Sequence, residues 1–297
     1  MKDGSIRTNP GVNNPDILEP LGDVDERVNV LRIDQKCGKS IVYVNFGDHA
    51  DTVGGCKISA DWPGFTRRMV EKALDNTRCV FFNGAQGDVN HVNVWPKPGD
   101  SNDMVRDFDD VDRGYGHARH MGNVVAGAVL QVYDKVAWFD ETSIRSVTKI
   151  VRILSNRPTP EELPEAHRIN DLHNAGRDNE LPYEGMMLTS VVADAARKVM
   201  LENGPDYFDV PVSAIAIGNV AMVTIPGEPF TEIGRELKKA EGWDMVMPMC
   251  LTDAGAGYYP VMQAYVEGGY EARASRFKAG VAEIMIDEGK QLLASLR

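Results

Sequence analysis

The sequence predicts an α/β fold, with a mixed β-sheet flanked by helices, in one domain that spans residues 1–297. Two observations support this prediction. Short apolar, β-branched runs alternate with longer stretches of helical periodicity, which is typical of βα units. Other apolar runs follow one another across tight turns, as in antiparallel hairpins. Parallel and antiparallel pairs should therefore occur together.

The first half of the chain should open on turns and then form three strands and two helices. Residues 1–27 are rich in Asn, Pro, Gly and Asp, which favour turns. The elements expected next are strands at 28–33, 40–46 and 79–82, and helices at 63–74 and about 115–133. Asp61 is a candidate N-cap, and Pro63 falls in the first turn of its helix.

The long segment 93–112 is expected to be a loop, because it is heavy in Asp, Pro and Asn. Its aspartates lack the Gly and Glu spacing of an EF-hand, which favours a solvated acidic loop over a calcium site. They are Asp107, Asp109, Asp110 and Asp112.

The second half should add a long strand, a helical pair, a hairpin and a closing helix. The expected strands are 144–154, 213–217, 220–225 and 245–250, and the expected helices are about 160–174, 182–202, 230–240 and 271–296. Gly218 and Asn219 make the two-residue turn of the hairpin.

Charge and hydropathy restrict the possible partners. The net charge of −12 argues against a nucleic-acid backbone. No apolar run approaches the roughly 20 residues that span a bilayer. No secretory signal follows Met1, so we expect a cytoplasmic protein if this start is real, and a secreted or periplasmic one if a preceding segment is missing. The sequence does not address the oligomeric state.

Polar residues follow two of the expected strands. Asp48, His49 and Asp51 come after the strand at 40–46, and Asp88, Asn90 and His91 come after the strand at 79–82. In open α/β sheets, ligands bind outside the carboxyl ends of the strands, and imidazole and carboxylate groups suit zinc. A single such residue is more often a loop cap or turn former. Two such loops together make a shared site an equal alternative.

Two further junctions and one helix carry candidate residues. Glu228 lies where a strand turns into a helix, a position that also suits an N-terminal Glu stabilised by the helix dipole. The Gly- and Tyr-rich loop 253–259 allows close approach of the backbone to a ligand. His117 and His120, three apart on a helix, favour a solvated face over a metal-binding pair.

Taken in order, these junctions resemble the catalytic domain of the neutral/alkaline non-lysosomal ceramidase family. The matching segments are 45–49 (NFGDH), 84–90 (GAQGDVN), 226–231 (PGEPFT) with Gly234 and Arg235, and 257–259 (GYY) followed by 270–272 (YEA). Each motif is weak alone, but four in order over nearly the whole chain are specific. The resemblance implies a ceramidase-like α/β domain that hydrolyses, with zinc, the amide joining a fatty acid to a sphingoid base.

The resemblance also implies a ligand set. The family's zinc is held by two His, one Glu and one Tyr, which correspond here to His49, Glu228 and Tyr258, with Tyr259 as the alternative tyrosine. Three protein ligands plus water is the arrangement of a catalytic zinc, whose activated water would attack the carbonyl of an amide or an ester.

Two departures from the family pattern qualify this expectation. The family's first zinc His lies in an upstream His-Thr-His segment, whereas this chain has no His before His49. The chain thus resembles a member lacking its N-terminal part, in which zinc binding is weak or absent. The family's catalytic serine is replaced by Asn90, whose amide can donate to an oxyanion but cannot attack. The family's C-terminal immunoglobulin-like domain is not expected, because the chain ends in a helix.

Two functions remain open from the sequence. The first is a metal-dependent hydrolase of a small-molecule or lipid-like amide, with Asp88, Asn90 and His91 as catalytic residues and His91 or Asp88 orienting or deprotonating the water. The second is a non-catalytic ligand-binding protein that keeps the scaffold and has lost the metal site.

Overall fold

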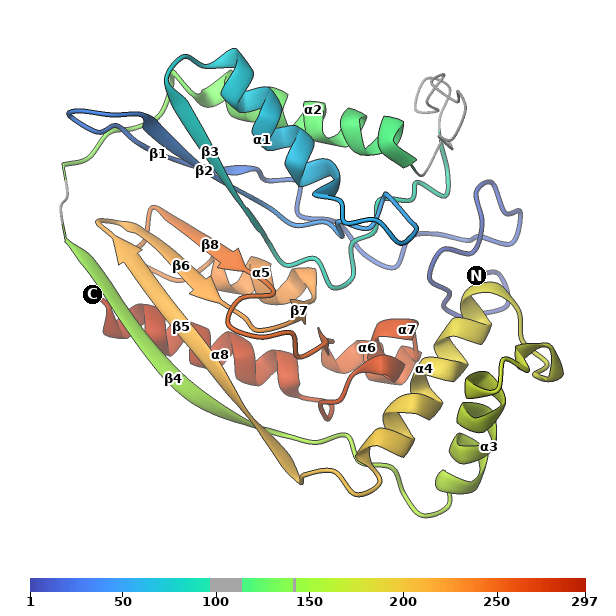
Figure 1. Cartoon of the computed structure of the whole chain (residues 1–297). Coiled ribbons are helices and arrows are strands. Elements are labelled where there is room, and N and C mark those ends of the chain that lie inside the picture. Colours follow the sequence, from blue (N-terminus) through green and yellow to red (C-terminus); the bar gives the residue numbers. More distant parts are fainter. Residues whose placement is uncertain (97–113, 141–142) are drawn as a thin grey trace.

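The computed structural model describes residues 1–96, 114–140 and 143–297. It confirms the α/β class, because helices flank mixed sheets (Figure 1). The strands do not form one sheet, however. They form two larger sheets and one two-stranded pair. The expected acidic loop with Asp107, Asp109, Asp110 and Asp112 lies outside the described residues.

The first sheet is built from the N-terminal third of the chain. It contains β1 (Asn29–Ile33), β2 (Ser40–Phe46) and β3 (Thr77–Asn83). β1 pairs antiparallel with β2, and β2 pairs parallel with β3. Helices α1 (Asp61–Ala73) and α2 (Gly114–Val132) cover its outer face, where Val42, Trp62 and Val129 are fully buried. The parallel pair sends the two following loops off the same edge.

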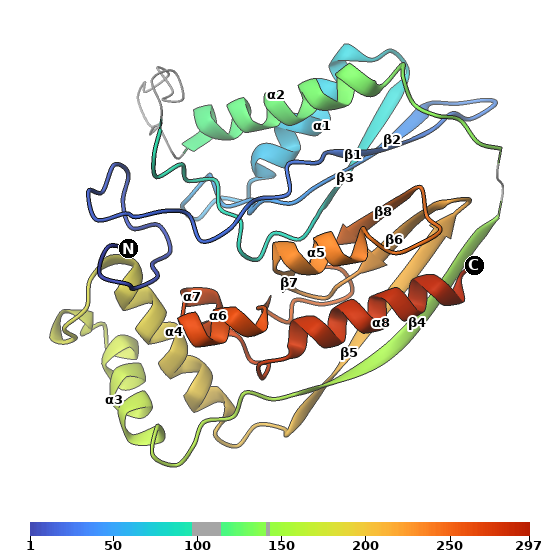
Figure 2. The same cartoon turned by 180° about the vertical axis from the view of Figure 1, so that it is seen from behind.

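The second sheet has the strand order β4-β5-β6-β8. Its strands are β4 (Ile144–Leu154), β5 (Tyr207–Ile217), β6 (Val220–Thr224) and β8 (Met245–Met249). The first three pair antiparallel, and β6 pairs parallel with β8. Helices α5 (Thr231–Leu237) and α8 (Val281–Ser295) pack on its outer face through Val223, Ile233 and Leu293 (Figure 2).

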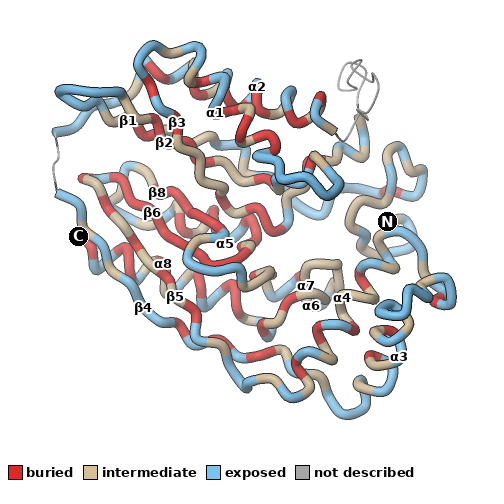
Figure 3. The backbone as a smooth tube through the Cα atoms, viewed as in Figure 1, coloured by how far each residue is buried: buried red, intermediate tan, exposed pale blue. Residues whose placement is uncertain are grey.

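An apolar layer joins the two sheets. Leu31 from the first sheet clusters with Met222 and Met247 from the second, and all three are buried. A hydrogen bond also joins the two sheets where β3 and β8 end, since the N–H of Cys250 donates to the carbonyl of Asn83 at 3.0 Å. The molecule is therefore layered as helices, sheet, sheet and helices, with buried residues concentrated along the strands (Figure 3).

Shorter elements complete the fold. Helices α3 (Leu163–Asn174) and α4 (Gly185–Leu201) form a hairpin, with the 3-10 turn η1 (Asp178–Glu180) between them. The pair β7 (Glu228–Pro229) and β9 (Tyr258–Tyr259) lies with α6 (Met262–Glu267) and α7 (Tyr270–Ala274) near the junction of the layers. In the described parts of the chain, no helix has the length and apolar character needed to cross a membrane.

Two expected elements were wrong in their bounds. The closing helix at 271–296 is broken into α7 and α8, because Phe277 is fully buried between them and Gly280 takes a φ of +101° just before α8. The strand expected at 213–217 begins at Tyr207 instead, since it pairs with β4 along the whole length of that strand.

Candidate active site

The loops after β2 and β3 run side by side. Phe46 and Asn83 are partners at the ends of the two strands. Beyond them, the N–H of His49 donates to the carbonyl of Val89 at 3.1 Å. Asn83 strengthens the link, because its amide donates to the Asp48 carbonyl at 2.8 Å and its Oδ1 accepts from the Asp48 N–H at 3.2 Å. His49 therefore sits on a loop that is fixed from both sides.

The two-stranded pair β7–β9 contributes Glu228 and Tyr258. They are register partners in the parallel pair β7–β9, and the N–H of Glu228 donates to the carbonyl of Gly257 at 2.9 Å. This pairing, which the sequence pattern did not indicate, sets the carboxylate and the phenol next to each other. Tyr259, the alternative tyrosine, is fully buried, and its hydroxyl donates to the Pro226 carbonyl at 3.2 Å. Only Tyr258 faces the site.

The loop after β3 meets the pair β7–β9 through backbone contacts. The N–H of Gly87 donates to the carbonyl of Pro229 at 2.8 Å. A Cβ on Gly87 would lie 2.4 Å from the carbonyl oxygen of Glu228, so only glycine allows this approach. Asp88 completes the junction, because its Oδ1 accepts from the N–H and the hydroxyl of Thr231 at 2.6 and 2.7 Å.

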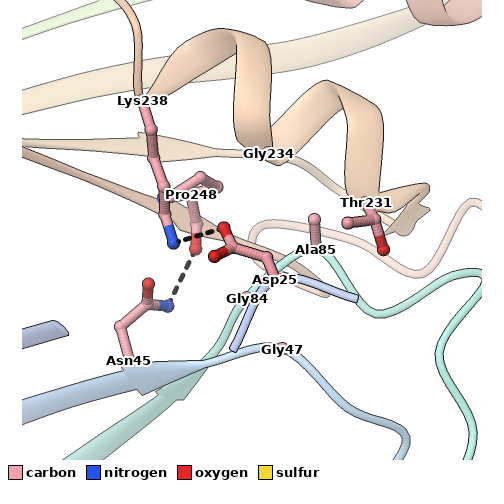
Figure 4. A pocket seen from close by; sticks show the side chains of 9 residues that line it. All are labelled: Asp25, Asn45, Gly47, Gly84, Ala85, Thr231, Gly234, Lys238 and Pro248. Atoms are coloured by element: carbon pink, nitrogen blue, oxygen red, sulfur yellow. Dashed lines mark hydrogen bonds and ion pairs between the residues drawn. The ribbon is translucent and has the colours of Figure 1, made fainter. Parts of the chain in front are cut away.

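Behind this junction lies a small polar cavity of about 10 Å³ (Figure 4). Its lining residues are Asp25, Asn45, Gly47, Gly84, Ala85, Thr231, Gly234, Lys238 and Pro248. Lys238 pairs with Asp25 at 2.9 Å, and the amide of Asn45 donates to the Pro248 carbonyl at 2.8 Å. The volume is that of one water molecule. The hydrogen bond between Asn45 of β2 and Pro248 of β8 links the two sheets beside the cavity. The cavity itself is too small for a substrate.

Two side-chain oxygen atoms lie close to Nε2 of His49. Its Nε2 lies 3.0 Å from Glu228 Oε2 and 3.4 Å from the Tyr258 hydroxyl. Its Nδ1 lies 2.8 Å from the Val89 carbonyl and must donate there, because a carbonyl can only accept. Gln86 steadies the carboxylate, since its amide donates to Glu228 Oε2 at 3.3 Å. We call His49, Glu228 and Tyr258 the triad.

His49 and Tyr258 hold their protons tightly. Burial disfavours the charged form of His49, but its hydrogen bonds to Glu228 and Val89, and the charge of Glu228, outweigh burial and raise its pKa to about 9. Burial and the charge of Glu228 raise the pKa of Tyr258 far above its ordinary value. A cation that binds the triad would replace at least the proton on His49 Nε2.

The two distances from His49 Nε2 suit neighbouring ligands of a tetrahedral ion. Bonds of about 2.0–2.2 Å to nitrogen and oxygen separate neighbouring ligands by roughly 3.3–3.6 Å, close to the observed 3.0 and 3.4 Å. The orientation of His49 by a carbonyl on its other nitrogen is the usual support of a metal-bound imidazole. Within the described ranges, no group of three or more His, Cys, Asp or Glu side chains could hold a metal ion; the third donor of the triad is a phenol.

The remaining residues expected from the sequence have different roles in the loop after β3. Asp88 is engaged with Thr231, so its carboxylate joins two elements, and burial raises its pKa. Asn90 Oδ1 accepts from the N–H of Val92 at 2.9 Å, an arrangement that leaves its amide N–H groups for other partners. His91 has a fully buried side chain whose Nδ1 lies 2.9 Å from Asp51 Oδ1.

Sequence reasoning missed several contributors. Asn83 and Gln86 belong to the same loop motif as Asp88, and their amide chemistry after a strand was the available signal. The ring of Tyr270 packs 5.9 Å from that of Tyr258. Glu271 accepts from the hydroxyl of Thr8 at 3.4 Å, so the N-terminal segment reaches the wall of the site. No short-range pattern predicts that last contact.

Comparisons with known proteins bear on the fold. No family model and no curated protein sequence matches the chain. The neutral ceramidase from Pseudomonas aeruginosa superposes with a TM-score of 0.59 at 14% identity, over 87% of this chain and 44% of that one. A ceramidase complexed with C2 gives a TM-score of 0.55 at 14% identity, over 87% and 46%. The chain therefore shares its fold with the neutral ceramidases, across less than half of their length.

Proposed function

We propose that the chain is a ceramidase-like, metal-dependent hydrolase of an amide, or an ester, formed as a single catalytic domain over residues 1–297. The observation that carries this proposal is the triad. Donor atoms from separate segments of the chain meet there, because His49 Nε2 lies 3.0 Å from Glu228 Oε2 and 3.4 Å from the Tyr258 hydroxyl. The fold shared with the neutral ceramidases supports the same reading.

The triad would hold zinc, which supplies Lewis acidity to polarise a carbonyl and to make water acidic. The protein's own residues do the rest. The Val89 carbonyl keeps the Nε2 of His49 directed at Glu228, and Gln86 keeps the carboxylate in place. Asn90 offers amide N–H groups that can donate to the oxygen on which negative charge develops. Asp88 keeps the Asn90 loop against α5.

We propose a small-molecule or lipid-like amide as the substrate, because structures of similar fold include a neutral ceramidase and a ceramidase complexed with C2. A non-catalytic binding protein is the rival. It is favoured by Asn90, which stands where the resembled family has a catalytic serine and provides no nucleophilic oxygen.

The test is turnover on a panel of N-acyl amides and simple esters with added zinc. Glu228→Gln removes a triad ligand with almost no change in shape, and Glu232→Gln is its matched control on the exposed side of α5. We expect turnover by the wild type and by Glu232→Gln, and its loss in Glu228→Gln. Equal turnover in all three would contradict the triad as the reacting centre. No turnover with or without metal would favour the binding protein.

A further inference from the structure

Among the residues that the structure describes, two buried polar atoms beside the triad find no hydrogen-bond partner. They are His91 Nε2 and Asp48 Oδ1. Each residue is only 7% exposed, and the His91 side chain is wholly buried. They come from the two loops that are cross-linked by the hydrogen bond between His49 and Val89. Buried polar atoms nearly always have a partner, so this pair calls for a ligand.

The hydrogen bond of His91 shows whether its unpartnered nitrogen, Nε2, offers a proton or a lone pair to a ligand. Its Nδ1 lies 2.9 Å from Asp51 Oδ1 and donates to it. In the neutral imidazole, Nε2 then carries a lone pair. A carboxylate that orients a histidine in this way is the usual outer partner of a metal ligand, since it fixes the tautomer and makes the free nitrogen more basic.

The donor atoms around His91 suit a cation. Asp48 and Asp51 place two carboxylates about one imidazole. The unprotonated Nε2 of an imidazole oriented in this way and a carboxylate oxygen are both electron-pair donors, and a cation binds both at once. A second imidazole, that of His117, lies with its centroid 6.0 Å from that of His91.

We propose that His91 Nε2 and Asp48 Oδ1 bind a divalent transition-metal ion at a position separate from the triad, with Asp51 as the positioning residue for His91. Imidazole and carboxylate donors suit Zn²⁺ and Co²⁺. This site does not depend on the hydrolase activity proposed above. Because it supplies two protein donors and no larger His, Cys, Asp or Glu group is present in the described residues, water completes its coordination, and it should bind more weakly than a site with three protein donors.

The experiment is a Co²⁺ titration of the metal-free full chain, followed by equilibrium dialysis with elemental analysis and by the visible spectrum of bound Co²⁺. We expect two equivalents in the wild type at saturation. His91→Ala should lose one of them, and Glu228→Gln should lose the other. His173→Ala, which alters an exposed histidine on α3, is the matched control and should keep both. Circular dichroism verifies that each variant is folded.

Asp51→Asn gives a second reading that leaves His91 in place. It should weaken the His91 equivalent by about 10–100-fold, the usual effect of losing an outer-shell partner. The site is refuted if the wild type binds no more than the equivalent that Glu228→Gln removes, or if His91→Ala and Asp51→Asn bind as the wild type does. If the wild type binds a single equivalent, and this equivalent is kept in Glu228→Gln but lost in His91→Ala, the result would uphold this site and contradict the metal role of the triad.

Discussion

The imidazole of His49 is oriented by the backbone carbonyl of Val89, which accepts from its Nδ1 at 2.8 Å. The acceptor belongs to the loop after β3, whereas His49 belongs to the loop after β2. The tautomer of the candidate ligand is thus fixed by parallel strand pairing and not by a neighbouring side chain. Nε2 is left facing Glu228.

The stability of the metal-free chain should fall as the pH rises from about 6.5 to about 9. The folded state raises the pKa of His49 to about 9 from 6.5. Its stabilising contribution is therefore complete below pH 6.5 and is lost as the pH passes 9, by at most ~3 kcal/mol. Urea unfolding at both pH values measures this. An identical pH dependence in His49→Gln would contradict it.

Glu228→Gln should lower the pKa of His49. The carboxylate both accepts a hydrogen bond from the ring and attracts its positive charge, and without it the opposing effect of burial prevails. We expect the pKa, followed by NMR titration of the ring protons, to fall from about 9 to 6.5 or lower. Glu232→Gln should leave it unchanged. A value that stays near 9 in Glu228→Gln would mean that another group holds the proton.

Zinc affinity at the triad should rise steadily with pH. The ion and a proton compete for His49 Nε2, whose pKa is about 9. The apparent affinity should therefore increase at least about tenfold per pH unit up to pH 9, whereas an ordinary histidine would level off near 6.5. Competition titrations with a chelator at several pH values measure the slope. A plateau above pH 7 would rule out protonated His49 as the competitor.

Gly87→Ala should disturb the junction of the two sheets. The new methyl group would lie 2.4 Å from the carbonyl oxygen of Glu228, and the loops must separate to admit it. We expect a loss of about 1–3 kcal/mol in unfolding free energy, as for other overpacked sites, together with weaker metal binding. Gly127→Ala is the matched control, because a Cβ on Gly127 of α2 meets nothing within 4 Å. The control should be neutral or stabilising by up to ~1 kcal/mol. Equal effects of the two changes would show that the close approach at Gly87 does not matter.

Asn90→Ala should slow hydrolysis if the Asn90 amide serves as the oxyanion donor. Removing one such donor costs roughly 2.7–4 kcal/mol in transition-state stabilisation, or about 10²–10³ in kcat. The measurement is kcat on the amide and ester panel, with Asn90→Ser beside it. Unchanged kcat in Asn90→Ala would remove the donor role and leave the hydrolase proposal intact. If the chain only binds its ligand, Asn90→Ser stays inactive and Asn90→Ala alters affinity alone.

The class of the fold and the candidate donors could be read from the sequence, because both depend on local patterns. The strand ends before His49 and Asp88 are short apolar runs that stop at glycine. The resemblance to the ceramidase family supplied Glu228 and Tyr258. The structure brings His49 and Glu228 to 3.0 Å. Tyr258 could be separated from Tyr259 only by the β7–β9 register, which turns the second ring into the core.

The rest depended on contacts between distant segments. Nothing local in the sequence separates one mixed sheet from two stacked sheets, since Leu31 and Met247 are equally apolar in either arrangement. The same holds for Asp88, which looks like a free carboxylate until α5 is placed against it. The break before α8 follows from the burial of Phe277 by the second core, and helical periodicity alone does not indicate it.

The junction at Gly87 and Pro229 also has a consequence for how the molecule unfolds. Each of the two larger sheets carries its own helices and its own apolar core. His49 follows a strand of the first sheet, whereas Glu228 and Tyr258 lie in the pair β7–β9, whose Tyr259 packs in the core of the second. A ligand shared by the triad would bind only when both cores are folded and docked, so its binding free energy would add to their cooperativity. The ligand-bound chain would then melt in one transition. Removal of the ligand would let the two cores melt at separate temperatures.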